Sequence, residues 1–169
     1  YGFIPGLYKC FDEGIVNCRD HWIRLLQKKN AGQDNIIPVT QIDIEVDKST
    51  GIITMMNNGN GIDVAKHPEH NIYIPEMIFG HLMTSTNYKK SQKKITGGKN
   101  GYGGKLANIF STHFILETVD SWNQKKYVQH FRDNMSVKEK PIITSCKTKP
   151  STKITYYPDF AKFNQKSLQ

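Results

Sequence analysis

The sequence carries a glycine-rich stretch at residues 95–110, ITGGKNGYGGKLANIF, with the composition of an anion-binding loop. Five glycines fall between positions 97 and 104, and Lys105 follows them directly. Backbone with so few Cβ atoms can approach a ligand closely, and a loop that runs into a helix presents free N–H groups. The expected ligand is an anion such as phosphate, with Lys105 facing it as a point charge.

This stretch does not match three better-known phosphate loops. A P-loop requires glycine at position 99, which is lysine, and Ser or Thr at position 106, which is leucine. The spacing of Gly101, Gly103 and Gly104 also differs from the dinucleotide fingerprint and the kinase loop. A flexible surface loop is therefore the alternative for this stretch taken alone.

Two further polar groups have residue types that suit a nucleotide. Glu13 and Asn17 are four residues apart, so a helix places them on one side, facing either a common ligand or solvent. The run NNGNG at residues 57–61 combines amides with glycines, which suits a backbone that bends around a ligand or a hairpin turn. Asn57, its first residue, offers both a donor and an acceptor.

The periodicity of apolar residues predicts the elements that position these groups. Residues 5–29 read as a long amphipathic helix, with Glu13 and Asn17 opposite an apolar stripe of Leu7, Phe11, Ile15, Cys18, Trp22 and Leu25 or Leu26. Shorter helices are predicted at residues 75–83 and 105–110. Strands are predicted at residues 41–46, 52–56, 114–119, 126–131, 142–146 and 153–157. This order predicts an α+β two-layer sandwich, a mixed β-sheet with helices on one face.

The composition is that of one domain with a core of its own. The chain has 169 residues, is 37% hydrophobic and has a formal charge of +8, which suits a polyanionic partner. Three cysteines without metal-ligand spacing indicate a reducing compartment. No stretch has the pattern of a membrane span or a signal peptide, so no membrane partner is expected. The sequence begins with YGFIPG and without an initiator methionine, so it is expected to be a fragment of a longer protein.

In this order, the three polar groups resemble the Bergerat-type (GHKL) ATP-binding fold shared by gyrase, large heat-shock chaperones, sensor histidine kinases and mismatch-repair ATPases. Three sequence segments resemble the N-terminal ATPase domain of eukaryotic-type DNA topoisomerase II, a type IIA topoisomerase. They are IPGLYKCFDEGIVN, NIYIPEMIFGHLMTSTNY and ITGGKNGYGGKLANIFST. The resemblance covers nearly the whole chain. It implies that residues 1–169 form one GHKL-type ATPase domain, without the transducer, cleavage and C-terminal domains of the family.

The resemblance also implies roles for individual residues. Glu13 matches the catalytic glutamate that polarises the attacking water, and Asn17 matches the asparagine that holds Mg²⁺ against the phosphates. Asn57 matches the residue that reads the adenine amino group. The other residues expected to bind ATP are Gly59 and Gly61 beneath the base, Ser85, Thr86 and Asn87 along the ribose and phosphates, Gly98, Lys99, Asn100, Gly101, Tyr102, Gly103, Gly104 and Lys105 in a lid, and Thr152 beside the adenine.

Two departures from the family pattern stand out. Gly14 replaces a residue that is usually aliphatic, which weakens the helix by ~1 kcal/mol. The segment at residues 21–39 is longer than the corresponding segment usual for the family, and no function is assigned to it.

The implied function is ATP binding and hydrolysis, coupled to dimer-gate closure and DNA strand passage. The cofactors are ATP and Mg²⁺, and the partners are DNA and a second copy of the full-length enzyme. The location is a nucleus, or a viral factory or cytoplasm if the source is a large DNA virus. The isolated piece is expected to have weak ATPase activity and no strand passage, and both a monomer and a dimer stay open for it.

Two alternatives stay open at this point. One is a GHKL ATPase of another class, chaperone-like or histidine-kinase-like. The other is a non-enzymatic nucleic-acid-binding module, which the net charge and the run KKSQKK at residues 89–94 favour.

Overall fold

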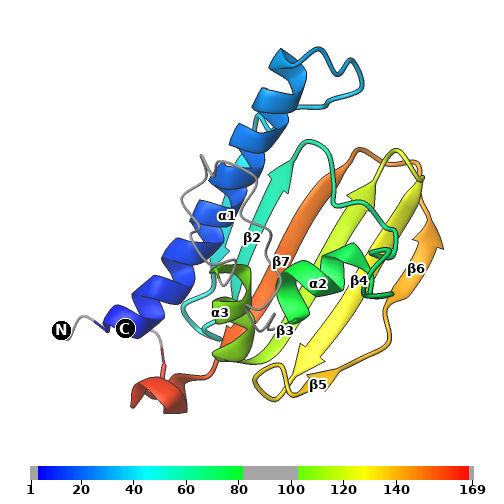
Figure 1. Ribbon diagram of the computed structural model, residues 1–169. Helices are drawn as coiled ribbons and strands as arrows, with labels where there is room; N and C mark the ends of the chain where they lie inside the picture. Colours follow the sequence, from blue (N-terminus) through cyan, green and yellow to red (C-terminus); the bar gives the residue numbers. More distant parts are fainter. Residues whose placement is uncertain (1–3, 82–102, 168–169) are drawn as a thin grey trace.

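A computed structural model of the chain describes residues 4–81 and 103–167, which form a seven-stranded sheet with helices on one face (Figure 1). Among these residues, no helix is long and apolar enough to cross a membrane. The helices are α1 (Pro5–Asn30), α2 (Ile74–Gly80), α3 (Gly103–Ile109) and the short 3-10 helix η1 (Phe160–Phe163). The strands are β1 (Ile42–Val46), β2 (Ile53–Asn58), β3 (Ser111–Asp120), β4 (Lys125–Arg132), β5 (Val137–Lys138), β6 (Ile142–Ser145) and β7 (Ser151–Pro158).

The order of the strands in the sheet is β1-β2-β7-β3-β4-β5, and β6 pairs with β4. The last strand, β7, therefore lies between β2 and β3. In this register Thr152 of β7 stands opposite Asn57 of β2 on one side and Thr118 of β3 on the other. The predicted class, an α+β sandwich with helices on one face, is confirmed. The sheet differs from the expected mixed one in detail, because every pairing between described strands is antiparallel.

The predicted helices are present with shifted ends. Both α1 and α2 have a proline in the first turn, where its missing N–H costs no hydrogen bond. Helix α2 ends at Gly80, and the backbone of His81 is extended. The prediction of a helix to residue 83 was therefore wrong at His81. Helix α3 begins at Gly103, earlier than predicted, so Gly104 and Lys105 belong to a helix. The short elements β5 and η1 were not predicted.

Helix α1 packs on the sheet through small residues. Its buried positions are Cys10, Gly14, Cys18 and Leu25. A Cβ at Gly14 would overlap the Sδ atom of Met55 on β2, so the methionine fills the space that an aliphatic residue at position 14 would take. The predicted apolar stripe was wrong at Trp22, which is 41% exposed.

The other half of the core is aromatic. Phe114 and Phe131 have no exposed surface, and their rings meet edge-on with centroids 6.0 Å apart. Phe79 of α2 lies 6.0 Å from Phe114, and a Cβ at Gly80 would overlap the ring of Phe131. The backbone at the end of α2 therefore lies directly against the core.

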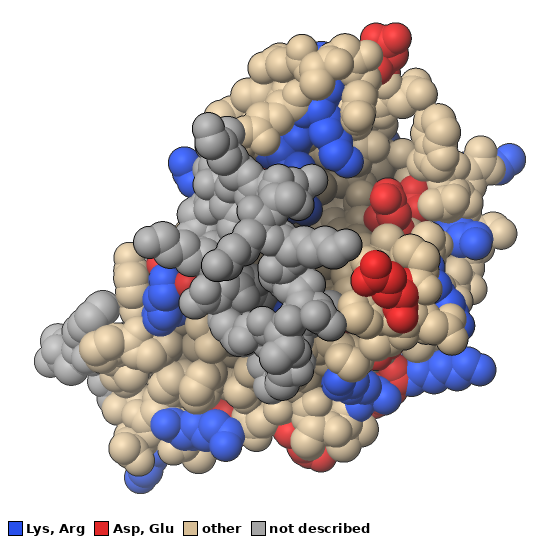
Figure 2. Space-filling view, viewed as in Figure 1, with Lys and Arg blue, Asp and Glu red and all other residues tan. Residues whose placement is uncertain are grey.

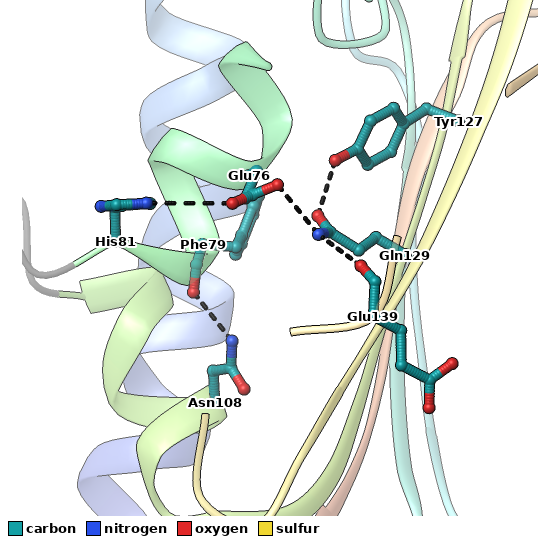
Figure 3. Close-up of polar contacts among 7 residues, drawn as sticks. All are labelled: Glu76, Phe79, His81, Asn108, Tyr127, Gln129 and Glu139. Carbon is teal, nitrogen blue, oxygen red and sulfur yellow. Dashed lines mark hydrogen bonds and ion pairs between the residues drawn. The ribbon is translucent and has the colours of Figure 1, made fainter. Parts of the chain in front are cut away.

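A buried polar network ties α2 to the sheet (Figure 3). The side chain of Gln129 on β4, a residue that is 1% exposed, donates two hydrogen bonds of 3.0 Å, one to Glu76 of α2 and one to the carbonyl oxygen of Glu139. The Tyr127 hydroxyl donates to the Gln129 carbonyl at 2.6 Å. Both hydrogens of the Gln129 amide are used, so directional contacts fix the position of α2.

Replacing Gln129 by Met is expected to destabilise the fold by about 1–3 kcal/mol, because the buried Tyr127 hydroxyl and Glu139 carbonyl lose their partners. The free energy of unfolding in urea measures this. Adding Tyr127→Phe should cost less than the sum of the two single changes, since a buried hydroxyl without an acceptor is then removed. Gln27→Met at an exposed position of α1 is the matched control. Equal midpoints for Gln129→Met and Gln27→Met would show that the network does not stabilise the chain.

Candidate functional site

A cavity of about 680 Å³ lies between α1, the segment from β2 to α2, and the ends of β2 and β7. This volume is within the range of pockets that enclose small ligands. Four of the predicted site residues line it, namely Asn17, Asn57, Gly61 and Thr152. In the space-filling view, basic side chains on the upper part of α1 stand beside a hollow whose opposite rim carries acidic side chains (Figure 2).

The floor of the cavity at the sheet is polar and buried. Asn57 is 4% exposed, and its Nδ2 donates to the carbonyl oxygen of Asn58 at 2.9 Å. No donor among the described residues contacts its Oδ1, so this acceptor is available to a ligand. The Thr152 hydroxyl lies 3.1 Å from that of Thr118, which also accepts the backbone N–H of Ile62 at 2.9 Å. Asn57 and Thr152 are thus cross-strand neighbours at the floor of the cavity.

Thr118 was missed by the sequence analysis. It lies within the predicted strand at residues 114–119, where nothing distinguishes it from an ordinary β-branched residue. Its hydroxyl fixes the segment after NNGNG to β3.

Two glycines of NNGNG are required by the backbone path. Gly59 has φ +91°, and a Cβ there would lie 2.9 Å from the Val39 nitrogen. A Cβ at Gly61 would overlap the Val119 carbonyl oxygen. The backbone therefore passes close to neighbouring backbone at both glycines. Of the two, Gly61 lines the cavity, and Gly59 is held against the Pro38–Val39 backbone outside its lining.

Helices α1 and α3 meet at Asn17. Its Nδ2 is buried and has no hydrogen-bond partner among the described residues. A Cβ on Gly104 would lie 3.3 Å from that nitrogen and 2.9 Å from the ring of Phe79. A buried amide without a partner costs about 1–3 kcal/mol. Because a carboxamide can rotate by half a turn, the same position can present either the N–H or the oxygen to a ligand.

Glu13 lies one turn before Asn17 on α1 but does not line the cavity. Its side chain is 17% exposed, and its Oε1 is 2.8 Å from Nζ of Lys9, which also contacts Asp12 at 3.1 Å. Hydrogen bonds to these carboxylates raise the pKa of Lys9. Lys9 is 55% exposed, so the pair is a weak surface contact that Glu13 can leave by rotating.

The side of α1 that carries Glu13 faces α3. Cys10 contacts the Leu106 carbonyl oxygen with its Sγ, and Asn17 approaches Gly104. Glu13 lies between these two contacts along the helix, within about 60° of both at 100° per residue. The expectation that Glu13 and Asn17 lie opposite the apolar stripe is therefore corrected, because α3 covers this side.

Lys105, in the first turn of α3, is a buried cation. The residue is 6% exposed, and burial lowers the pKa of its ammonium group. Among the described residues no carboxylate pairs with it. Nearby, Nδ2 of Asn108 donates to the Phe79 carbonyl oxygen at 2.9 Å and joins α3 to α2 (Figure 3). A buried ammonium group in this setting gains from a bound anion.

The predicted lid and ribose residues lie mostly outside the described part of the chain. This applies to Ser85, Thr86, Asn87, Gly98, Lys99, Asn100, Gly101 and Tyr102. Gly103, Gly104 and Lys105 are described, as the start of α3.

The cavity extends beyond the predicted residues along α1. His21, Arg24 and Lys28 line this extension, and Trp122, 72% exposed in the turn after β3, lines it as well. The His21 Nε2 is 2.6 Å from the Asn60 carbonyl oxygen, and burial lowers the pKa of its imidazole. The spacing of His21, Arg24 and Lys28 from Asn17 on the same helix could have indicated this wall. Part of the segment at residues 21–39 therefore borders the cavity.

Comparison with known proteins identifies relatives over nearly the whole chain, although no protein-family model matches it. The chain is 52% identical over 166 residues to DNA topoisomerase 2 of Acanthamoeba polyphaga mimivirus, which covers 98% of this chain and 12% of that protein. It is 48% identical over 168 residues to DNA topoisomerase 2 of Arabidopsis thaliana, with coverage of 99% and 11%. The chain thus spans about a tenth of the length of these relatives.

Solved structures agree with this result. The ATPase region of Saccharomyces cerevisiae topoisomerase II superposes with a TM-score of 0.83 at 46% identity, covering 99% of this chain and 42% of that one. These relatives give no support to the chaperone-like, histidine-kinase-like or nucleic-acid-module alternatives. The chain belongs to the DNA topoisomerase 2 family and has the GHKL fold of that family's ATPase region.

Proposed function

We propose that residues 1–169 bind MgATP in the cavity beside α1 and hydrolyse it, as the ATPase domain of a type IIA DNA topoisomerase. The observation that carries the proposal concerns Asn17 and Asn57, which line one cavity from two elements. Each keeps an amide atom that no described residue satisfies. In the whole enzyme, nucleotide binding would close a dimer gate and drive DNA strand passage, in a nucleus or a viral factory. Alone, the chain would turn over slowly.

The adenine would occupy the floor of the cavity. Oδ1 of Asn57 can accept a hydrogen bond from the exocyclic amino group, with the Thr152 hydroxyl beside it. Gly61 lets the chain pass beneath the base, because its missing Cβ leaves room for the Val119 carbonyl oxygen of β3. Ile62, Ile78 and other apolar side chains of the cavity wall would cover the ring faces. The floor therefore offers one polar edge and apolar walls, as a purine requires.

The triphosphate would lie at the junction of α1 and α3. The Asn17 amide and the Lys105 ammonium suit a magnesium-bound polyphosphate, since one supplies an amide oxygen and the other a positive charge. Bound Mg²⁺ neutralises charge on the phosphate oxygens. Residues 85–87 and 98–104 complete this site in the proposal, with Gly59 shaping the turn that leads to it.

Glu13 would act on the attacking water. After leaving Lys9, its carboxylate accepts a proton from the water as the water oxygen bonds to the γ-phosphorus. The bond from that phosphorus to the β–γ bridging oxygen breaks, and ADP departs with the electron pair. Apart from this proton transfer, the chain's contribution is to position the reactants and to balance their charge.

Asn57→Ala should weaken binding of a non-hydrolysable ATP analogue with Mg²⁺ about 5- to 150-fold, the equivalent of one buried hydrogen bond. Isothermal titration calorimetry measures the affinity. The preference for the adenine over the guanine analogue should fall as well, since Asn57 reads the amino group. Asn30→Ala, at the exposed end of α1, is the control. Unchanged affinity in Asn57→Ala would remove the adenine assignment.

Glu13→Gln should keep nucleotide affinity and lower the rate of hydrolysis about 100- to 10,000-fold, because a general base is lost and the shape is retained. Single-turnover hydrolysis with the chain in excess over ATP measures the rate. Asp12→Asn is a matched control, since Asp12 contacts the same Lys9. A Glu13→Gln chain that hydrolyses ATP as fast as Asp12→Asn would exclude Glu13 as the base.

Nucleotide affinity should fall as the pH rises from neutral through the lowered pKa of Lys105. Burial favours the neutral amine in the free chain, whereas a bound triphosphate favours the ammonium, so binding takes up a proton in this range. The dissociation constant at a series of alkaline pH values measures the effect. Lys105→Met should bind more weakly at neutral pH and show a flatter profile, while Lys29→Met at an exposed site should follow the wild type. Parallel profiles for Lys105→Met and wild type would contradict the assignment.

A further inference from the structure

A group of metal-type ligands lies outside the cavity lining, in the loop that leads into α2. His67, Glu69 and His70 each offer one ligand atom, and the three atoms lie within 4.8 Å of one another. The two imidazole rings stack with centroids 5.0 Å apart and an interplanar angle of 27°. Among the described residues this is the one group of three such side chains.

The backbone of this loop is closed by hydrogen bonds. Lys66 and Tyr73 form an isolated antiparallel bridge across its base. Within it, the His67 N–H donates to the Ile72 carbonyl oxygen at 2.8 Å, and the Asn71 N–H donates to the His67 carbonyl oxygen at 2.9 Å. The positions of the ligand residues are therefore largely set before any ion arrives, which lowers the entropic cost of binding.

The side chains can close around an ion without moving this backbone. Tetrahedral binding with nitrogen and oxygen ligands needs ligand atoms about 3.3 Å apart. Glu69 and His70 are exposed, so their side chains can turn inward. Nδ1 of His67 accepts the Glu69 N–H at 3.3 Å, a long hydrogen bond that a metal ion can replace. Lys66, which precedes His67 in the chain, directs its ammonium group over the Tyr73 ring, 5.6 Å from the centroid.

We propose that His67, Glu69 and His70 bind one divalent transition-metal ion of the imidazole-preferring class, such as Zn²⁺, with water completing its shell. Two imidazoles and a carboxylate suit such an ion, whereas Mg²⁺ and Ca²⁺ prefer sites built from oxygen. None of the three side chains lines the nucleotide cavity, so the site is independent of the proposed function.

Metal binding here would stabilise the start of α2. Tyr73, at the end of the loop, packs edge-on against Tyr127 of the sheet with centroids 5.7 Å apart. The next residue, Ile74, lines the cavity together with Ile78. An ion that ties His67 to His70 therefore restrains one wall of the cavity through the loop that precedes it.

Calorimetric titration of the chelator-treated chain with Zn²⁺, in excess Mg²⁺, tests the site. One equivalent should bind to the wild type. His70→Ala and Glu69→Gln should each weaken binding at least about tenfold, since even outer-shell changes commonly cost that much. His113→Ala is the matched control, because it removes an imidazole whose Nε2 lies 2.9 Å from Nδ1 of His130 on the sheet. Binding unchanged in His70→Ala, or lost in His113→Ala, would overturn the proposal.

Hydrogen exchange gives a second measurement that does not depend on affinity alone. Zn²⁺ should slow exchange of the backbone amides at residues 66–74 in the wild type and leave them unchanged in His70→Ala. Co²⁺ should give the visible absorption of a tetrahedral site in the wild type and in His113→Ala. Protection that appears elsewhere in the chain instead, or an absorption spectrum that persists in His70→Ala, would place the ion at other ligands and refute the assignment.

Discussion

The arrangement of the site depends on the position of β7 between β2 and β3. This position sets Asn57, Thr152 and Thr118 in one row across three strands. Thr118 then bonds the backbone at Ile62, which carries the chain from the end of β2 across the sheet edge. A shift of β7 by one residue would turn Thr152 to the other face of the sheet. The polar floor of the cavity is thus a consequence of strand register.

The walls of the cavity depend on close approach between backbones. Gly14 brings α1 against Met55, and Gly104 brings α3 against Phe79 and Asn17. A larger side chain at either position would push a helix away from the groups it has to meet. The same constraint explains why three of the four buried residues of α1 are Cys or Gly, while Trp22 stays outside. Glycine in this chain serves close packing of helices as well as loops near a ligand.

Local patterns in the sequence predicted most elements because helix and strand periods are local properties. The resemblance brought Asn17, Asn57 and Thr152 together, and the cavity contains all three. The contact between α1 and α3 could not be predicted, because it depends on where Gly104 falls relative to Asn17 in space. Thr118 was missed because its hydroxyl looks like any other in a strand. The basic wall at Arg24 was missed because no function was assigned to residues 21–39, although the helical spacing of Arg24 from Asn17 could have indicated it.

The polar residues of the interior divide into two groups by whether the fold satisfies them. Gln129 uses all its amide hydrogens to position α2, so it contributes to the scaffold. The buried amide nitrogen of Asn17 has no partner in the described part of the chain. An unpaired buried atom does not mark a site by itself. The Tyr156 hydroxyl and Oδ1 of Asn108 also find no partner within residues 4–81 and 103–167, and neither residue lines the cavity.

A ligand can supply the missing hydrogen bond only if the unpaired atom also lies at the cavity. Asn17 meets both conditions, and Lys105 in the adjoining turn of α3 adds a buried charge. Both groups destabilise the ligand-free fold, one through a missing hydrogen bond and the other through desolvation. A magnesium-bound polyphosphate offers the Asn17 amide a partner and Lys105 an anion, so it lowers both costs and links binding to folding stability at this junction. The Gln129 network and the aromatic core hold the surrounding elements in place and so help the fold to tolerate this unfavourable polar burial.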